Sequence, residues 1–238
     1  MTEISNAGRF LNGEILLFDK PLGWTSFDLV RKVRNVLYRS YKLKKLKVGH
    51  AGTLDPCATG LMILCTGKAT KQIDLLQAQE KEYIATLKLG ATTPSYDLET
   101  EENAVFPIGH INFETIEQTL KQFVGNIEQI PPVFSAVKIN GKRAYEHARR
   151  GEEPEIKPKN IVVYDIKILS FDMPEVKLLI TCSKGTYIRA IARDLGFALQ
   201  SGAYLTGLRR TRSGQFNVDD ALFIDNFLKE YDSNDLKI

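Results

Sequence analysis

The chain has 238 residues, of which 43% are hydrophobic and 26% are charged, and its net charge is +3. These values are typical of an ordinary globular protein, long enough for one domain with a substantial core, and no apolar stretch is long enough to span a membrane. The three widely spaced cysteines exclude a disulfide framework and a structural zinc site, and the polar N-terminal segment has no signal-peptide core, so we expect a cytoplasmic protein.

The first 89 residues predict two strands and one helix, and one apolar run among them fits either a strand or a helix. Residues 14–18 predict a short buried strand that ends in the turn-forming residues 19–23. Thr25 offers an N-cap with Asp28 three residues later, and apolar residues then recur at helical spacing, which predicts a helix from Ser26 to about Tyr38. The apolar run 61–65 is either a buried strand or the start of a helix. Residues 82–89 alternate, which predicts a strand with Tyr83 on its apolar face.

The remaining elements are interspersed helices and strands. Asn112 predicts the cap of a helix that continues to about residue 123, and Thr186 the cap of a second helix that reaches Leu199. We expect strands at 134–139, 161–169, 176–182 and 205–212, and further helices at 144–150 and 219–231. Because strands and helices do not alternate regularly, the pattern favours an α+β fold, and no linker divides it.

The basic residues are concentrated in three clusters, whereas acidic residues are frequent in 97–102 and after 218. A single cluster is typical of a solvated surface, but three of them beside candidate site motifs indicate a polyanionic partner, because neutralised phosphates supply most non-specific affinity for nucleic acid. The clusters are Arg31, Lys32, Arg34, Arg39, Lys42, Lys44, Lys45 and Lys47; Lys138, Lys142, Arg143, Arg149 and Arg150; and Arg209, Arg210 and Arg212.

Residues 49–60 present one acidic side chain, Asp55, from a segment rich in Gly, Pro and Thr. Glycine widens the backbone's choice of conformation, and Pro56 fixes its own φ and biases Asp55 toward an extended or turn conformation. We therefore expect a stiff loop, neither helix nor strand. Two roles fit Asp55: a turn former that bonds its own backbone, or a reactive carboxylate that acts as nucleophile, general base or electrostatic stabiliser.

Other catalytic motifs are missing from the sequence. Residues 67–70 lack the spacing and the Ser or Thr of a phosphate-binding loop, the three histidines lack metal-ligand spacing, and no serine lies in a G-x-S-x-G motif. Asp55 is therefore the main candidate, and a nearby arginine would keep its carboxylate ionised. Two segments offer that arginine, 187–189 and 208–210.

Five segments in order resemble the motifs of the TruB-type tRNA pseudouridine synthases, which convert the uridine at nucleotide 55 of the tRNA T-loop to pseudouridine. The segments are Lys20-Pro21, residues 49–71, Lys81-Glu82-Tyr83, residues 182–189 and residues 203–210. The resemblance covers roughly Gly13 to Arg212. Two small departures are Ala51, where Thr is common, and Cys57, where a larger apolar residue is common.

The resemblance implies roles for individual residues. Asp55 would initiate cleavage of the glycosidic bond, by attack on the uracil ring, by attack on the sugar or by removal of a sugar proton, before the uracil is rotated and rejoined through carbon. Arg189 would pair with Asp55, and Tyr83 would stack on the uracil and act as the base that removes the ring proton. The remaining residues would shape the pocket: Leu208, Tyr187, Lys20 and Pro21, with His50 filling the space left by the flipped base.

The resemblance also implies a mixed, largely antiparallel sheet flanked by helices, with an RNA-binding insertion at about 105–155. We expect one catalytic domain, 1–238, without a separate C-terminal RNA-binding domain of the PUA type. Such an enzyme would act as a monomer on the T-stem-loop of tRNA, without guide RNA or membrane. Metal and cofactor are not expected, because the leaving and attacking groups belong to one nucleoside. Three alternatives are a catalytically idle RNA-binding module, a synthase that modifies RNA elsewhere, and a carboxylate-dependent hydrolase of small molecules.

Overall fold

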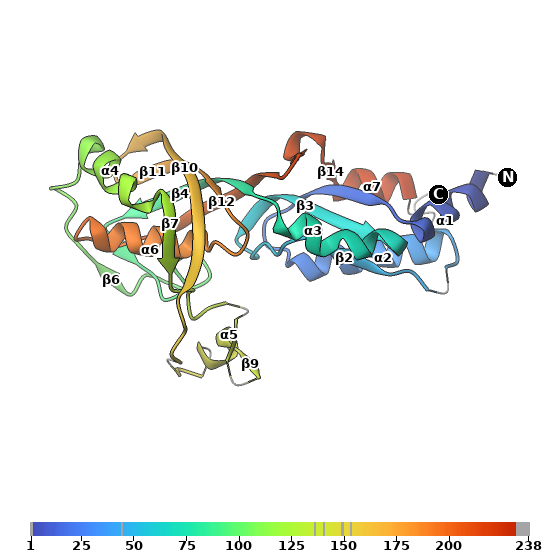
Figure 1. Ribbon diagram of the computed structural model, residues 1–238, viewed down its shortest axis with the longest axis horizontal. Coiled ribbons are helices and arrows are strands. Elements are labelled where there is room, and N and C mark those ends of the chain that lie inside the picture. The colour runs from blue at the N-terminus through green and yellow to red at the C-terminus, as the bar shows by residue number, and fades with distance from the viewer. Residues whose placement is uncertain are drawn as a thin grey trace. The chain divides into compact units, whose positions relative to one another are not determined.

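The computed structural model describes residues 2–43, 45–135, 137–139, 141–148, 150–152 and 154–231 (Figure 1). Its contacts divide the chain into two compact units, residues 1–81 with 209–238 and residues 82–208. We call these unit 1 and unit 2 and describe each by itself; a single catalytic domain stays a prediction. Within the described ranges, no helix combines the length and the apolar character that a membrane span requires.

Unit 1 is built on strands that pair in the order β14-β1-β3-β12, with β2 beside β3 and β13 beside β12. β1 is antiparallel to β3 and parallel to β14. Its elements are α1 (Thr2–Asn12), β1 (Ile15–Lys20), α2 (Ser26–Ser40), β2 (Val48–His50), β3 (Ala58–Thr66), the 3-10 helix η1 (Gly67–Gln72), α3 (Ile73–Ala78), the second half of β12 (Ala203–Ser213), β13 (Phe216–Asn217), η3 (Val218–Asp220), β14 (Leu222–Phe223) and α7 (Ile224–Tyr231).

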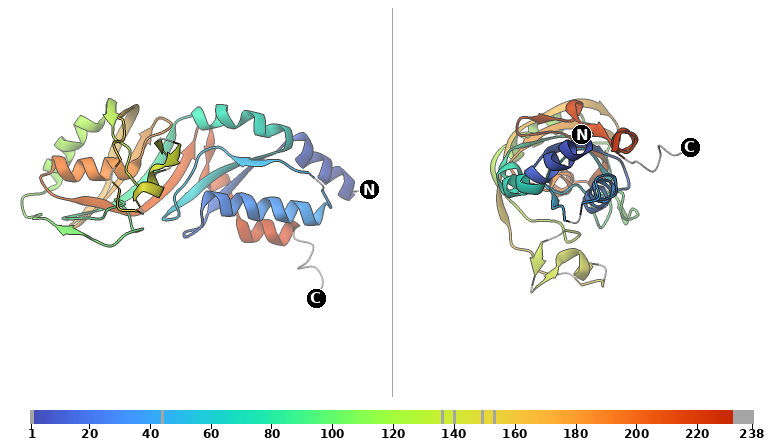
Figure 2. Two further views of the ribbon diagram at one scale, coloured as in Figure 1. Left: turned by 90° about the horizontal axis from the view of Figure 1, so that it is seen from below. Right: turned by 90° about the vertical axis from the view of Figure 1, so that its right-hand side faces the viewer.

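The strands of unit 1 are covered on both faces, which explains their continuous apolar runs. Figure 2 shows α2 and α7 on one face and α3 on the other. Leu61 and Ile63 of β3 belong to the core on the α3 side. Met62 points the other way, since its sulfur lies 3.7 Å from the Ser26 hydroxyl of α2. The apolar run 61–65 is therefore a strand, which resolves the alternative that the sequence leaves open.

Unit 2 holds a sheet of order β12-β4-β11-β10-β7, to which β12 contributes its first half. β10 is antiparallel to both of its neighbours. The mixed, largely antiparallel sheet expected from the sequence is thus confirmed. The elements are β4 (Lys81–Leu89), β5 (Ala91–Thr92), β6 (Ala104–Val105), α4 (Phe113–Leu120), η2 (Lys121–Phe123), β7 (Gly125–Gln129), β8 (Lys138–Ile139), β9 (Lys142–Arg143), α5 (Ala144–Ala148), β10 (Lys159–Asp172), β11 (Glu175–Cys182) and α6 (Ile188–Ala198).

Of two predicted helix caps, the one at Thr25 is formed and the one at Thr186 is not. Thr25 and Asp28 form the complete capping box of α2, with bonds in both directions, as expected. Thr186 does not cap α6, because its hydroxyl donates to the carbonyl of Ser183 in the preceding turn. Tyr187 is the N-cap residue instead, without a side-chain cap bond.

Three predicted elements differ from the structure. The strand expected at 134–139 is reduced to β8, and residues 133–135 are bends, while Ala136 and Asn140 lie outside the described residues. The helix expected at 144–150 ends at Ala148, and Arg149 also lies outside. The final helix starts at Ile224, because Leu222 and Phe223 pair with Phe18 and Asp19 as a short parallel strand. Helices α1 and α3 were not among the predicted elements.

Candidate functional site

Asp55 lies in the loop between β2 and β3, and backbone bonds tie both ends of that loop. The amide of Ala51 donates to the carbonyl of Ile63 at 2.9 Å, and the amide of Ala58 donates to the carbonyl of Asp55 at 3.0 Å. The loop is shorter than predicted, since Gly49 and His50 belong to β2 and residues 58–60 to β3. We call residues 51–57 the Asp55 loop.

The turn that follows β1 holds the Asp55 loop from one side. Lys20 pairs with Gly60 across β1 and β3, so the two segments run side by side. The amide of Gly23 donates to the carbonyl of Pro56 at 2.9 Å. The fully buried Lys20 ammonium closes the turn by donating to the carbonyls of Pro21 and Trp24, at 3.0 and 2.7 Å. The turn that begins with Lys20 and Pro21, predicted to support the pocket, is therefore bonded through Gly23 to the residue that follows Asp55.

Helix α2 provides another tether that the sequence did not indicate. The Ser26 hydroxyl donates to the carbonyl of Leu54 at 2.9 Å and accepts from the Leu54 amide at 2.8 Å. Ser26 is buried, and so is Leu54. A serine at the start of a helix gives no hint of this contact in the sequence, because its partner lies 28 residues further along.

Burial shifts the pKa values of Lys20 and His50, two titratable groups near this loop. Burial lowers the pKa of Lys20 to about 8, and the negative charges of Asp55 and Cys57 oppose the shift. Burial also lowers the pKa of His50, and the positive charge of Arg210 adds to the effect. Both effects favour the neutral imidazole of His50 at pH 7.

The lowered pKa of Lys20 makes a prediction about stability. Between pH 8 and about 10.5 the unfolded chain keeps the Lys20 proton that the folded chain has lost, so folding becomes more favourable as the pH rises. We expect the unfolding free energy of the wild type to increase relative to Lys20→Met across this window. Urea denaturation at pH 7, 8, 9 and 10 measures the difference, and Lys71→Met, at an exposed position, is the control. A difference that stays constant with pH would contradict the prediction.

Arg189, in unit 2, is a buried residue and not an exposed arginine of the first helical turn. It is 4% exposed, and its Nη1 and Nη2 donate to the carbonyls of Ser95 and Phe134, at 3.2 and 2.9 Å. Its Nε lies 3.5 Å from the buried carboxylate of Asp97. The sequence did not point to Asp97, which lies in an acidic stretch that is otherwise typical of a solvated loop.

The other predicted residues of unit 2 lie on its sheet and at the start of α6. Tyr83 is 9% exposed on β4, whose buried face it shares with Leu87 as the alternation predicts. The buried Gln129 holds Tyr187 by both backbone groups, at 2.8 and 3.1 Å. Leu208 is half-buried on β12.

The predicted site residues therefore belong to two sets. Asp55, His50, Lys20 and Pro21 are in unit 1, where the structure brings them together around the Asp55 loop. Tyr83, Tyr187, Arg189 and Leu208 are in unit 2. The pairing of Arg189 with Asp55 stays a prediction.

The third basic cluster is not a free cationic surface. Arg209 forms two bonds with the carboxylate of Asp19, at 3.0 and 2.6 Å, and Arg212 lies 2.6 Å from Glu80. Arg210 is 1% exposed. This cluster, expected from the sequence to face a polyanion, is thus occupied largely by internal contacts. Among the described residues, no group of three or more His, Cys, Asp or Glu side chains is arranged to hold a metal ion.

Comparisons with known proteins agree with this fold. A solved Cbf5–Nop10–Gar1 complex contains a chain that is 30% identical, with a TM-score of 0.71; the match covers 93% of this chain and 55% of that one. A solved H/ACA RNP bound to a substrate RNA containing 2'-deoxyuridine gives a TM-score of 0.68 at 27% identity, over 95% of this chain and 57% of that one.

The family models define the class as pseudouridylate synthases, which are isomerases. Residues 39–188 match the TruB family pseudouridylate synthase N-terminal domain, and residues 189–236 match the tRNA pseudouridylate synthase B C-terminal domain. The tRNA pseudouridine synthase B of Parabacteroides distasonis is 61% identical over 93% of this chain and 95% of its own length. That of Flavobacterium johnsoniae is 52% identical over 92% and 96%. The chain belongs to the TruB family.

Proposed function

We propose that this chain isomerises uridine to pseudouridine at nucleotide 55 in the T-loop of tRNA, as a stand-alone cytoplasmic monomer. The observation that carries the proposal is the Asp55 loop, which presents one carboxylate from a segment tied to β1, α2 and β3. Such a fixed carboxylate suits chemistry in which positioning and one charged group do most of the work. The match to the TruB family along nearly the whole chain supports the substrate.

Asp55 acts in this proposal as the group that initiates glycosidic cleavage on a uridine flipped out of the T-loop. Extruding a base costs a few kcal/mol, and stacking on an aromatic ring such as Tyr83 returns about 1–3 kcal/mol. Arg189 orients Asp55 and keeps its carboxylate ionised, and Tyr83 acts as the base that removes the proton of the uracil ring. Leu208 and Tyr187 line the uracil pocket, and Lys20 and Pro21 support it. His50 fills the space that the flipped base leaves in the T-loop. The catalytic domain spans 1–238, and 105–155 is the RNA-binding insertion.

The experiment that tests the proposal is a map of pseudouridine in tRNA from a strain that lacks this protein. We expect nucleotide 55 to remain uridine, and a plasmid with the wild-type chain to restore the modification. An unchanged T-loop would contradict the proposal and favour an RNA-binding module. Loss of pseudouridine elsewhere in the RNA would favour the second candidate, a synthase with a different target.

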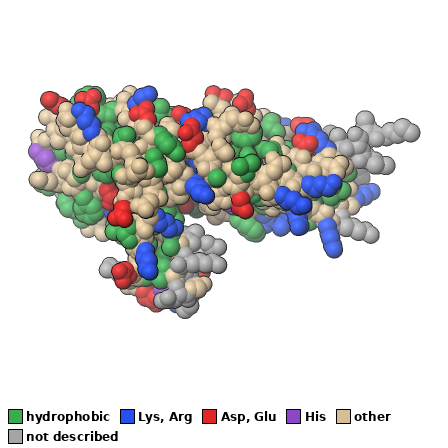
Figure 3. All heavy atoms as spheres, in the orientation of Figure 1, with side chains coloured by type: hydrophobic (Ala, Val, Ile, Leu, Met, Phe, Trp, Pro, Cys, Tyr) green, Lys and Arg blue, Asp and Glu red, His purple; other side chains and the backbone are tan. Residues whose placement is uncertain are grey.

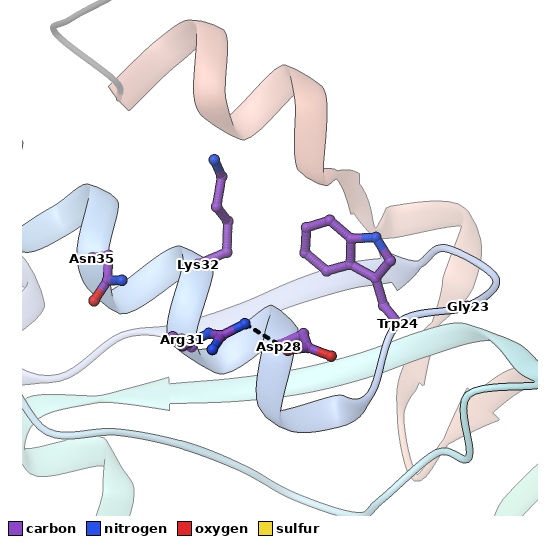
Figure 4. Close-up of a pocket in the computed structure, with 6 residues that line it drawn as sticks. All are labelled: Gly23, Trp24, Asp28, Arg31, Lys32 and Asn35. Carbon is purple, nitrogen blue, oxygen red and sulfur yellow. Dashed lines mark hydrogen bonds and ion pairs between the residues drawn. The ribbon is translucent and has the colours of Figure 1, made fainter.

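The first basic cluster is the best candidate for phosphate contacts, because two of its members, Lys45 and Lys47, are exposed on both sides of the buried Leu46. On the face in Figure 3, Lys and Arg side chains also gather over unit 1, where Figure 1 shows α3 in front. Figure 4 shows a pocket on α2 in which Arg31 is held by Asp28, at 2.9 Å, while Lys32 points away from that pair. Lys44 of this cluster lies outside the described residues.

Neutralising these lysines should weaken tRNA binding in a salt-dependent way. Each phosphate contact contributes about 0.7–0.9 to the slope of log K against log salt, so the double variant Lys45→Gln and Lys47→Gln should reduce the slope by about 1.4–1.8. Adding Lys44→Gln tests the whole lysine run of this cluster. Filter binding at several salt concentrations measures the slope. Lys177→Gln with Lys229→Gln, also exposed, removes the same charge elsewhere. Equal slopes for both pairs would show that Lys45 and Lys47 only face solvent.

A further inference from the structure

Arg210 is a buried arginine whose contacts converge on the Asp55 loop. It is 1% exposed. Its Nε donates to the carbonyl of Leu61 at 2.7 Å, and its Nη2 to the carbonyl of Gly52 at 3.2 Å. Nη1 lies 3.5 Å from the carbonyl of Thr53 and Nη2 3.3 Å from the sulfur of Met62. One guanidinium thus joins β3 to the two loop residues that precede Leu54 and Asp55.

Two glycines with positive φ face this arginine. Gly60 has φ +101°, and a Cβ there would lie 2.3 Å from the carbonyl oxygen of Arg210, so only glycine lets β12 approach β3 this closely. Gly52 has φ +112°, and a Cβ there would lie 3.4 Å from Nη1 of Arg210. Two of the three glycines of the 49–60 segment therefore lie against Arg210.

The buried position excludes a direct role in RNA binding and favours a role in geometry. Guanidinium is planar and presents its donors in a rigid fork, so it holds several carbonyls at fixed relative positions, which an ammonium cannot. Its charge lies near the functional groups of unit 1, since it contributes to the lowered pKa values of Lys20 and His50. A misplacement of about 1 Å in a catalytic group costs about 10²-fold in rate.

We infer that Arg210 is a positioning residue for Asp55: its guanidinium holds the carbonyls of Gly52 and Thr53 and thereby sets the direction in which the loop presents the carboxylate. The inference rests on the proposed role of Asp55. Neighbouring arginines of β12 do not share this function, because Arg209 and Arg212 bond carboxylates.

The test replaces Arg210 by lysine, which keeps the charge and removes the fork. We expect kcat on tRNA to fall about 10- to 100-fold at a temperature well below the unfolding midpoint, with the Kd for tRNA unchanged within about twofold. Arg212→Lys is the matched control on the same strand and should keep the wild-type kcat. A wild-type kcat for Arg210→Lys, whatever its melting temperature, would overturn the inference. So would a parallel loss of tRNA binding, which indicates an RNA contact.

Gly52→Ala provides a second variant in case Arg210→Lys does not fold. The backbone of Gly52 has φ +112°, which is strained for alanine, so the substitution should shift the loop relative to the guanidinium. We expect kcat to fall while the protein stays folded, and full activity would overturn the inference. If both variants fold, the double variant should lose less kcat than the product of the two single losses, because both substitutions act through one contact. Independent, multiplicative losses would contradict this.

Asp55→Asn separates the proposed function from the role of Arg210. If Asp55→Asn retains activity, the proposed function fails. If Asp55→Asn is inactive while Arg210→Lys has the wild-type kcat, only the inference about Arg210 fails.

Discussion

Asp55→Asn should reduce kcat by at least about 10⁴-fold and leave the Kd for tRNA within about threefold of the wild type. The substitution keeps the shape of the side chain and removes the charge to which the proposal assigns glycosidic cleavage, and losses of this size are typical when a central catalytic group is removed. Tritium release from tRNA labelled at the uracil 5-position measures the rate, and filter binding measures the affinity.

Two further variants make this test specific for position. Asp55→Glu keeps the charge but displaces it by one methylene, and we expect a loss of about 10²-fold or more because the loop is fixed at both ends. Asp165→Asn, on an exposed part of β10, should retain full activity. Substantial activity of Asp55→Asn would rule out the proposed role of this carboxylate.

Arg189→Met should affect both stability and activity. Removing one partner of a buried ion pair leaves the other charge uncompensated, which typically costs about 3–5 kcal/mol. We therefore expect urea denaturation to show a loss of this order, because the buried Asp97 carboxylate loses the positive charge of Arg189. If Arg189 also orients Asp55, kcat should fall by about 10²–10³-fold, the range found when a single electrostatic donor is removed.

The double variant Arg189→Met with Asp97→Asn separates the two effects. The asparagine removes the buried charge and keeps an oxygen that accepts from the amide of Glu99, which lies 3.0 Å from the carboxylate. Much of the lost stability should return while the catalytic defect persists. Recovery of activity together with stability would mean that Arg189 serves only Asp97. Arg189→Lys is the conservative control and should keep part of the stability.

Much of the fold follows from short-range patterns. The capping box of α2, the alternation of β4 and the Asn112 cap of α4 are all formed as predicted, because each depends on residues within one or two turns of one another. The loop predicted at 49–60 is formed in its central part, residues 51–57, whereas its two ends belong to β2 and β3. Errors arise where a distant partner competes, as in the first residues of the expected final helix, which pair with β1.

The three arginines at 209, 210 and 212 show what tertiary contacts add. They are equivalent in the sequence, and together they predict a basic surface. In the folded chain, strand geometry and the partners available on each side give them different environments: Asp19 bonds one, the Asp55 loop bonds the next, and Glu80 bonds the third. Ser26 and Asp97 likewise gain their roles from partners far along the chain. The sequence by itself identifies Asp55 as the candidate carboxylate in a stiff loop, and only the family resemblance supplies the proposed reaction. The groups that hold the Asp55 loop lie up to 158 residues away along the chain, and they meet it only when the core is formed.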